Sequence, residues 1–385
     1  MKWLNVLLVF VPISIALEFA HASPGLVFLS ACLAIVPLAG IIGSATEELA
    51  KFLGPTWGGL LNATFGNATE LIIAVLAARE GLLDVVKASI TGSIIGNLLL
   101  VMGFSFVAGG LRHKTQHFNQ HMAGLHSSLL VMSVLALMVP AAFVHAVPGL
   151  YEKSLAAVPA PHVEALSLGV AVVLICVYLL SLFFSLKTHE SLFSGPEIES
   201  AGPRMKISTA IWILLAGTLF IALESEFLVG SIVPVTESLR LSQLFVGVVV
   251  VAIVGNAAEH AAAVMFARRN HMDVAINIAI GSSTQIALFV APVLVFASLA
   301  VGHPMTLIFN PFELVSIAFA VTITAVIALD GQSHWMEGVL LIAAYIVIAM
   351  AFYFIPTGRP APPPSRAHVT QVWSAPCVRP PFCLR

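Results

Sequence analysis

Two short polar motifs interrupt otherwise apolar stretches of the sequence, and their side chains could bind a cation. Gly66-Asn67-Ala68-Thr69-Glu70 recurs as Gly255-Asn256-Ala257-Ala258-Glu259. Further along, Gly92-Ser93 recurs as Gly281-Ser282, and in both copies the glycine follows the motif glutamate by 22 residues. Two matched elements at one spacing indicate that the sequence contains an internal repeat.

The repeated motifs supply the oxygen atoms that a hard cation prefers. Asn67 and Glu70 are three residues apart, so they share one face of a helix, and the same holds for Asn256 and Glu259. Ca²⁺ takes six to eight oxygen ligands, which suits this set better than it suits a soft transition metal. The sequence predicts a Ca²⁺ or proton site at Glu70 and Glu259, with further polar groups from Ser93, Asn97, Ser282, Ser283 and Gln285.

A glutamate inside an apolar stretch has a competing interpretation as a protonated core residue. An ionisable side chain at the centre of a membrane helix costs about 2.5–3.5 kcal/mol on insertion scales, so a functional role is favoured where the glutamate is repeated. The two interpretations are evenly balanced for acidic residues closer to span ends, which are assigned to gating or access: Glu47, Glu48, Glu224 and Glu226. His260 adjoins Glu259 and either tunes that carboxylate or makes a separate contact.

The elements that must position these motifs are membrane helices. The 385 residues are 59% hydrophobic and only 9% charged, whereas a soluble protein carries about a quarter charged residues. The net charge of −2 excludes a basic nucleic-acid binder. At about 20 apolar residues per crossing, the pattern predicts an all-α polytopic membrane protein of about eleven transmembrane helices. The apolar runs are 3–20, 24–53, 56–79, 84–110, 122–146, 164–186, 207–230, 241–267, 272–301, 310–329 and 335–356.

The repeat copies lie five runs apart, which predicts how the helices are arranged. Because five is odd, equivalent helices cross the bilayer in opposite directions. An inverted repeat of this kind places a transporter's binding site at the repeat interface near the midplane. We expect an N-terminal helix (1–22), a first five-helix repeat (23–187), a cytoplasmic linker (188–205), a second five-helix repeat (206–356) and a disordered proline-rich tail (357–385).

Basic residues in the loops predict the orientation. Residues 1–22 also resemble a cleavable signal peptide, but Glu18 and the length of the run favour a retained helix. Nine basic residues fall on the N-terminal side: Lys2, Lys51, Arg112, Lys114, Lys187, Arg204, Lys206, Arg268 and Arg269. Four fall on the other side: Arg79, Lys87, Lys153 and Arg240. This asymmetry predicts a cytoplasmic N-terminus, in a bacterial-type inner (plasma) membrane.

Motifs for other chemistries are missing. The sequence contains no Walker-type phosphate loop and no His-Glu-x-x-His, so ATP-driven pumping and zinc proteolysis are not expected. His113, His117 and His121 have helical spacing but flank Arg112 and Lys114, which favours a solvated loop over a metal site. We find no nucleophile–base pairing, so we expect a transporter that needs no cofactor and is not an enzyme.

The paired motifs resemble a known family. GNATELIIA and GNAAEHAAAV, together with GSIIGNLLLV and GSSTQIALFV, are similar to the two α-repeats of the CAX branch of the Ca²⁺/cation antiporters, over about residues 24–356. The resemblance implies exchange of Ca²⁺ for protons, with Glu70 and Glu259 at the positions of the ion-binding glutamates. Some members carry a strongly acidic helix between the halves, whereas 188–205 has three glutamates, which puts regulation from that loop in doubt.

Two other functions stay open at this point. A Na⁺(K⁺)/H⁺ exchanger could use the same pair of carboxylates, and Mn²⁺ could be a further cargo. A cation channel is disfavoured by the inverted repeats and by the scarcity of a continuous polar stripe. Flux that tracks a proton gradient would distinguish an exchanger from a channel.

Overall fold

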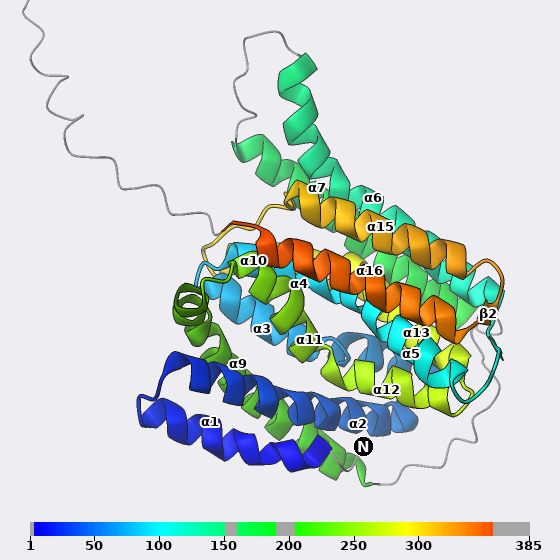
Figure 1. The fold of residues 1–385 in the computed structure, drawn as a ribbon, viewed down its shortest axis with the longest axis horizontal. Helices are drawn as coiled ribbons and strands as arrows, with labels where there is room; N and C mark the ends of the chain where they lie inside the picture. The colour runs from blue at the N-terminus through cyan, green and yellow to red at the C-terminus, as the bar shows by residue number, and fades with distance from the viewer. Residues whose placement is uncertain (1–3, 151–159, 190–204, 357–385) are drawn as a thin grey trace, which may run out of the picture.

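The computed structural model describes residues 4–150, 160–189 and 205–356 (Figure 1). The predicted linker 188–205 and tail 357–385 therefore lie almost entirely outside the described residues. The described chain is helical nearly throughout, which confirms the predicted all-α polytopic fold.

The helices and strands follow one another in two halves. The first half contains η1 (Leu4–Val9), α1 (Phe10–Phe19), α2 (Pro24–Phe65), α3 (Ala68–Arg79), α4 (Leu83–Ile95), η2 (Gly96–Val101), α5 (Met102–Gly110), β1 (Gln116–His117), α6 (Gln120–Leu150), α7 (Ala160–Phe183) and η3 (Phe184–Thr188). The second half contains α9 (Ile207–Leu239), α10 (Gln243–Phe245), η4 (Val246–Val251), α11 (Ala252–Gly255), α12 (Ala257–Arg268), α13 (Met272–Gln285), η5 (Ile286–Val290), α14 (Ala291–Ala300), α15 (Pro311–Ile327), β2 (Gln332–Ser333) and α16 (Trp335–Phe354).

Each predicted apolar run coincides with helix in this order. Within the described residues, seven helices are long and apolar enough to cross a membrane, or eight if the bent pair 243–255 and 257–268 is one span. Two shorter apolar helices, Asn5–Phe19 and Pro311–Ile327, correspond to the first and tenth predicted runs.

The long helix α2 turns back on itself where the second predicted run ends. A Cβ built on Gly58 would lie 2.6 Å from the carbonyl oxygen of Ala50. In a straight helix, residues eight positions apart are separated by about 12 Å along the axis. The chain therefore turns sharply after the candidate span Pro24–Leu53, and its last part leads toward α3.

Both polar motifs break their helices at the asparagine, which the continuous apolar runs 56–79 and 241–267 did not predict. Asn67 has φ −96° and ψ 15°, and Asn256 has φ −97° and ψ 5°, which is the bridge region and not the α region. The helical segments on either side of Asn256 are bent by 61°. The expectation that each asparagine and glutamate share one face of an unbroken helix is therefore corrected, since Asn67 and Asn256 immediately precede α3 and α12.

The helices around the two breaks pack closely because small residues face each other. A Cβ on Gly92 would lie 2.6 Å from the Cα atom of Val248, and one on Gly247 would lie 2.9 Å from the carbonyl oxygen of Val85. In a membrane, where lipid is as apolar as the protein, such close van der Waals packing replaces the hydrophobic effect as the force between helices.

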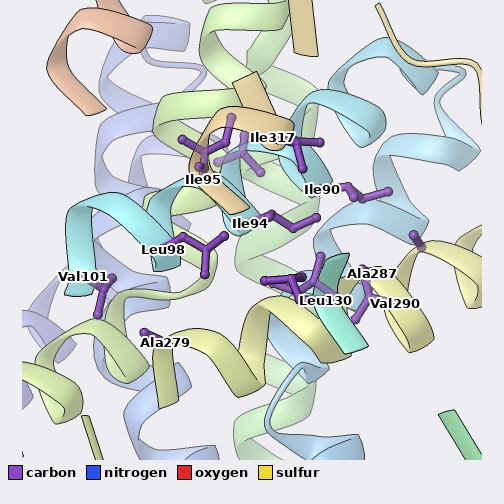
Figure 2. Close-up of a cluster of buried hydrophobic side chains, with 14 of the residues drawn as sticks. Ile90, Ile94, Ile95, Leu98, Val101, Leu130, Ala279, Ala287, Val290 and Ile317 are labelled. Carbon is purple, nitrogen blue, oxygen red and sulfur yellow. The ribbon is translucent and has the colours of Figure 1, made fainter. Parts of the chain in front are cut away.

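One apolar cluster joins the two halves of the chain. Figure 2 shows Ile94 and Leu98 of the first half close to Ala279 and Ala287 of the second, with Leu130 of α6 beside them. In Figure 1, α3, α4, α11 and α12 lie between a group formed by α1, α2 and α9 and a group that contains α15 and α16. The broken helices thus occupy the centre of the molecule.

Three loops meet at one end of the bundle. The strands β1 and β2 pair antiparallel, with Gln116 opposite Ser333. The Gln116 side chain also donates a 2.9 Å hydrogen bond to Asn270, which joins the loop after α12 to the same cluster. His117 lies in β1, so the helical spacing of the three histidines is not realised, and the described residues hold no cluster of three His, Cys, Asp or Glu side chains suited to a metal.

Candidate cation-binding site

The two motif glutamates occupy equivalent places at the starts of half-helices. Glu70 is the third residue of α3, and Glu259 is the third residue of α12. The first turn of a helix leaves backbone N–H groups unbonded and carries partial positive charge. Each helix break therefore favours a carboxylate at the position where the motif supplies one.

The breaks bring the two motifs together across the repeat interface. A Cβ on Gly255 would lie 3.3 Å from Cγ of Glu70, and a Cβ on Gly66 would lie 3.7 Å from Oε1 of Glu259. Each glutamate thus rests against the glycine of the opposite motif, and a Cβ on Gly255 would crowd Glu70. The two carboxyl groups are close enough to interact electrostatically.

The motif asparagines are almost fully buried and are held by the opposite repeat. The Asn67 amide donates a 2.7 Å hydrogen bond to Oε1 of Gln285. The Asn256 amide donates a 2.9 Å bond to the Ser93 hydroxyl and a 3.0 Å bond to the Ala252 carbonyl oxygen. In both cases a side chain from the opposite repeat, Gln285 or Ser93, fixes the amide group.

Three further predicted polar residues form a chain of contacts from His260 through Asn97 to Ser282. Nε2 of His260 lies 3.2 Å from Oδ1 of Asn97, whose amide donates a 3.1 Å bond to the Ser282 hydroxyl. His260 therefore makes a contact of its own with the opposite repeat. Ser282 and Glu259 both line the large cavity described below.

Ser283 is the one predicted ligand that points to backbone. Its hydroxyl lies 2.9 Å from the Ala279 carbonyl oxygen and 3.5 Å from that of Ile94. The structure places it between α13 and α4 as a packing contact, and it does not bring Ser283 to the two carboxylates.

Several buried oxygen atoms at the meeting point have no hydrogen-bond donor within the described residues. They are Oε2 of Glu70, Oε2 of Glu259 and Oδ1 of Asn256. A buried acceptor without a donor is costly, and a hard cation or a proton on the carboxyl group would remove that cost. The donor set, made entirely of oxygen, fits Ca²⁺.

A cavity of about 740 Å³ leads from one end of the bundle to Glu259. Its walls include Gly66, Ser282 and Gln285 near the site, and Glu47 and Ser185 farther out. Glu70 is not among the described residues that line it. Water and ions can therefore reach one glutamate of the pair from this side.

The acidic residues assigned to gating lie in four different surroundings. Glu47 lines the large cavity, and Glu48 forms a 2.6 Å ion pair with Lys51. Glu226 lines a second cavity of about 480 Å³ near the opposite ends of the helices, 3.7 Å from Arg79. Glu224 is fully buried and lies 2.7 Å from the Ser14 hydroxyl of α1.

The large cavity also has polar lining residues that sequence reasoning missed. They include Ser44, Asn62, Thr69, His126, Ser185 and Asn277. A signal was present for Asn277, because Asn277, Gly281 and Gln285 recur every four residues and so form a polar stripe on one face of α13.

Comparisons with known proteins agree with this geometry. A family model described as sodium/calcium exchanger protein matches residues 23–187 and 209–354. The Ca(2+)/H(+) antiporter of Aphanothece halophytica is 49% identical over 365 residues, which cover 91% of this chain and 96% of that protein. The Ca(2+)/H(+) antiporter ChaA of Bacillus subtilis is 42% identical over 349 residues, covering 90% and 97%. The solved structure of native YfkE matches with a TM-score of 0.78 at 40% identity, covering 91% of this chain and 99% of that one.

Proposed function

This chain belongs to the sodium/calcium exchanger protein family and exchanges Ca²⁺ for H⁺ across a membrane, and we propose that Glu70 and Glu259 bind both ions in turn. The observation that carries the proposal is the contact of each motif glutamate with the opposite motif's glycine. The two carboxyl groups then share one site at the crossing of the broken helices.

Electrostatics makes the two ions exclude one another at such a site. A bound Ca²⁺ requires ionised carboxylates. Partial burial of the site strengthens the attraction between the cation and these carboxylates. When the cation leaves, two like charges remain close together in a medium of low dielectric constant, so proton binding becomes favourable. One site thus carries either Ca²⁺ or protons, and neither ion needs a cofactor or an enzymatic step.

Alternating access would expose this site to each side of the membrane. The 740 Å³ cavity supports access from the end that carries Glu47 and Ser185, while Glu226 lines the separate cavity at the other end. In transporters with inverted repeats, one helix group moves as a rigid body against the other. Such a movement would close the first cavity and open a path on the opposite side.

The distribution of basic loop residues supports a cytoplasmic N-terminus and hence a cytoplasmic opening for the large cavity. In a plasma membrane with an inward proton gradient, this orientation has the protein expel Ca²⁺. Na⁺, K⁺ and Mn²⁺ are the competing cargoes to be tested, because carboxylate oxygens also bind them.

The test is Ca²⁺ uptake into inverted membrane vesicles under an imposed pH difference. With the vesicle interior acidic, we expect uptake that stops when a protonophore collapses the gradient. Uptake that continues without any proton gradient would indicate a channel. Addition of Na⁺, K⁺ or Mn²⁺ outside would suppress the signal if that ion shares the site, and Na⁺-driven uptake at equal pH would overturn proton exchange.

A further inference from the structure

The internal repeat pairs each residue on one route to the site with a counterpart on the other route. Glu259 follows Glu70 by 189 residues, and the other paired motif residues keep this spacing. Because we expect the repeat to be inverted, a residue that faces one side of the membrane has its counterpart facing the other side. Differences between counterparts therefore indicate chemical differences between the two routes.

Two asparagines in the large cavity have apolar counterparts. Asn62 and Asn277 both line this cavity, and both are exposed. At the 189-residue spacing, the counterpart of Asn62 is Val251, which is 4% exposed. The counterpart of Asn277 is Ala88, which is fully buried. Amide groups thus lie on the route from the large cavity, whereas buried apolar side chains occupy the equivalent positions of the other repeat.

Asn62 lies one helical turn from the site. It precedes the motif glycine Gly66 by four residues. A Cβ on Gly66 would lie 2.7 Å from the Asn62 carbonyl oxygen and 3.7 Å from Oε1 of Glu259. The turn that carries Asn62 therefore leads directly to the Glu259 carboxylate.

Asn277 lies farther from the site, on the polar face of α13. Gln285, at the inner end of this face, accepts the hydrogen bond from Asn67. Eight residues of helix place Asn277 about 12 Å from Gln285 along the axis. A Cβ on Gly281, midway between them, would lie 3.4 Å from Oδ1 of Asn277 and, among the described residues, would meet no other atom within 4 Å beyond its own stretch of helix. The wall between Asn277 and the site is therefore open, and the Asn277 oxygen lies at its edge.

We propose that Asn277 and Asn62 are two successive staging positions, at which amide oxygens replace water around a Ca²⁺ ion that enters from the large cavity. Ca²⁺ accepts side-chain amide oxygens as ligands. A neutral amide attracts the ion less strongly than a carboxylate does, so the ion can move on to Glu259. This inference rests on the proposed role of Glu259 as the next binding group.

The staging positions make the capture of Ca²⁺ different at the two faces of the membrane. The route from the large cavity offers amide oxygens ahead of the carboxylates, and the counterparts Val251 and Ala88 have no side-chain oxygen to offer. An amide group does not take up protons in the pH range of transport, so the staging positions act on the cation alone.

The first measurement is the apparent KM for Ca²⁺ at each face of the membrane, from uptake into acid-loaded vesicles that are either inverted or right-side-out. Asn62→Val and Asn277→Ala give each asparagine the side chain of its own counterpart. Each variant should raise the KM about three- to tenfold at the face of the large cavity, the range for one neutral polar contact, and leave the KM at the other face unchanged. Equal increases at both faces, or no increase at either face, would overturn the inference.

Ser185→Ala is the matched control in the same cavity. The Ser185 hydroxyl lies 3.2 Å from the Leu182 carbonyl oxygen, so it is already bonded to backbone, and its loss should leave the KM unchanged at both faces. A rise in KM in this control equal to that of the asparagine variants would mean that any polar loss in the cavity has the same effect, and it would contradict the assignment of the two amides.

Asn277→Asp tests the position with a change of opposite sign, and it serves where a smaller side chain prevents folding. Aspartate keeps the size of asparagine and adds charge, so the KM for Ca²⁺ should fall at the face of the large cavity alone. Acidifying that face should abolish this gain, because the new carboxylate takes up protons, whereas the effect of Asn277→Ala should be the same at every pH. A KM that does not fall in Asn277→Asp would count against the staging position.

Glu259→Gln separates failure of this inference from failure of the proposed function. If Glu259→Gln still transports Ca²⁺ at the parent rate, the shared-carboxylate site is wrong and the two asparagines do not lead to it. If Glu259→Gln is inactive while Asn62→Val and Asn277→Ala keep a normal KM at both faces, only the staging role is wrong.

Discussion

At the scale of single residues, the site consists of carboxylates placed where helix backbone already favours negative charge. Glu70 and Glu259 each lie in the first turn after a break, so unbonded N–H groups and the half-helix dipole act on them together. Glutamine keeps the size of glutamate and one accepting oxygen, but it cannot ionise. The charge can therefore be removed with little change in packing.

We predict that Glu70→Gln and Glu259→Gln each abolish ΔpH-driven Ca²⁺ uptake, because each loses charge toward the cation and a site for the proton. Uptake of radioactive Ca²⁺ into vesicles, normalised to the amount of folded protein in the membrane, measures this. Near-parental uptake by either variant would remove that glutamate from the mechanism.

The motif asparagines should act on affinity more than on rate. Asn67→Ala and Asn256→Ala each remove one amide oxygen and no charge, so we expect a higher apparent KM for Ca²⁺ with a smaller loss of maximal rate. Initial rates over a range of Ca²⁺ concentrations give both quantities. If both variants retain the parental KM, the asparagines serve only to break and pack the helices.

The sequence allowed prediction of the motif residues but not of their hydrogen bonds. The repeat singled out Glu70 and Glu259 because an ionisable group recurs in two apolar stretches. By symmetry Asn67 would contact Ser282, as Asn256 contacts Ser93, yet it donates to Gln285. Ser282 accepts a hydrogen bond from Asn97, which is a three-dimensional contact that spacing does not encode.

At the scale of helices, the breaks at Asn67 and Asn256 are the elements that create the site. Apolar runs predicted where helices lie, since each run is long enough to cross the bilayer. They could not predict the breaks, because polar residues within an apolar run do not by themselves show whether the helix continues through them. Asparagine tolerates the bridge conformation, and its side chain bonds to the opposite repeat there.

Close approach of α4 and η4 holds the breaks against each other, and Gly92 is the residue that permits it. Gly92→Ala would place a Cβ 2.6 Å from the Val248 Cα atom, so we predict a loss of stability of about 1–3 kcal/mol from overpacking. The midpoint of thermal unfolding in detergent measures the effect. Gly96→Ala is the matched control four residues later, where a Cβ meets nothing within 4 Å, and equal midpoints for the two variants would contradict the packing argument.

At the scale of the whole molecule, an inverted repeat gives one site and two routes to it. The odd number of runs between motif copies predicts two five-helix halves of opposite orientation, and this remains a prediction. The asymmetry between the cavities could not be predicted, because under the proposed alternating access it describes one of two states of the same sequence. The cavity of about 740 Å³ on the Glu47 side reaches Glu259, whereas the cavity of about 480 Å³ on the Glu226 side includes neither motif glutamate among its lining residues.

Competition between protons and Ca²⁺ is the property of the whole cycle that tests a shared site. Acidifying the Ca²⁺-loading side adds protons to the carboxylates there, so the apparent KM for Ca²⁺ should rise as pH falls, while the maximal rate changes less. The experiment holds the opposite side at fixed pH and varies the loading side. A KM that is independent of pH, with only the maximal rate changing, would mean that protons cross by a separate path. His260→Ala should leave the competition in place.

The large cavity has a consequence for pharmacology. Its volume of about 740 Å³ falls in the range of pockets that hold drug-sized molecules, roughly 300–1,000 Å³, and its deep end carries the Glu259 carboxylate. A cationic amphiphile of that size would bind in the cavity and stabilise the state open toward Glu47. It would compete with Ca²⁺ from that face alone. Applied to opposite faces of sealed vesicles, a membrane-impermeant blocker should inhibit from one side only. Such a compound would be a state-selective inhibitor whose potency reports how much of the time the carrier faces that side.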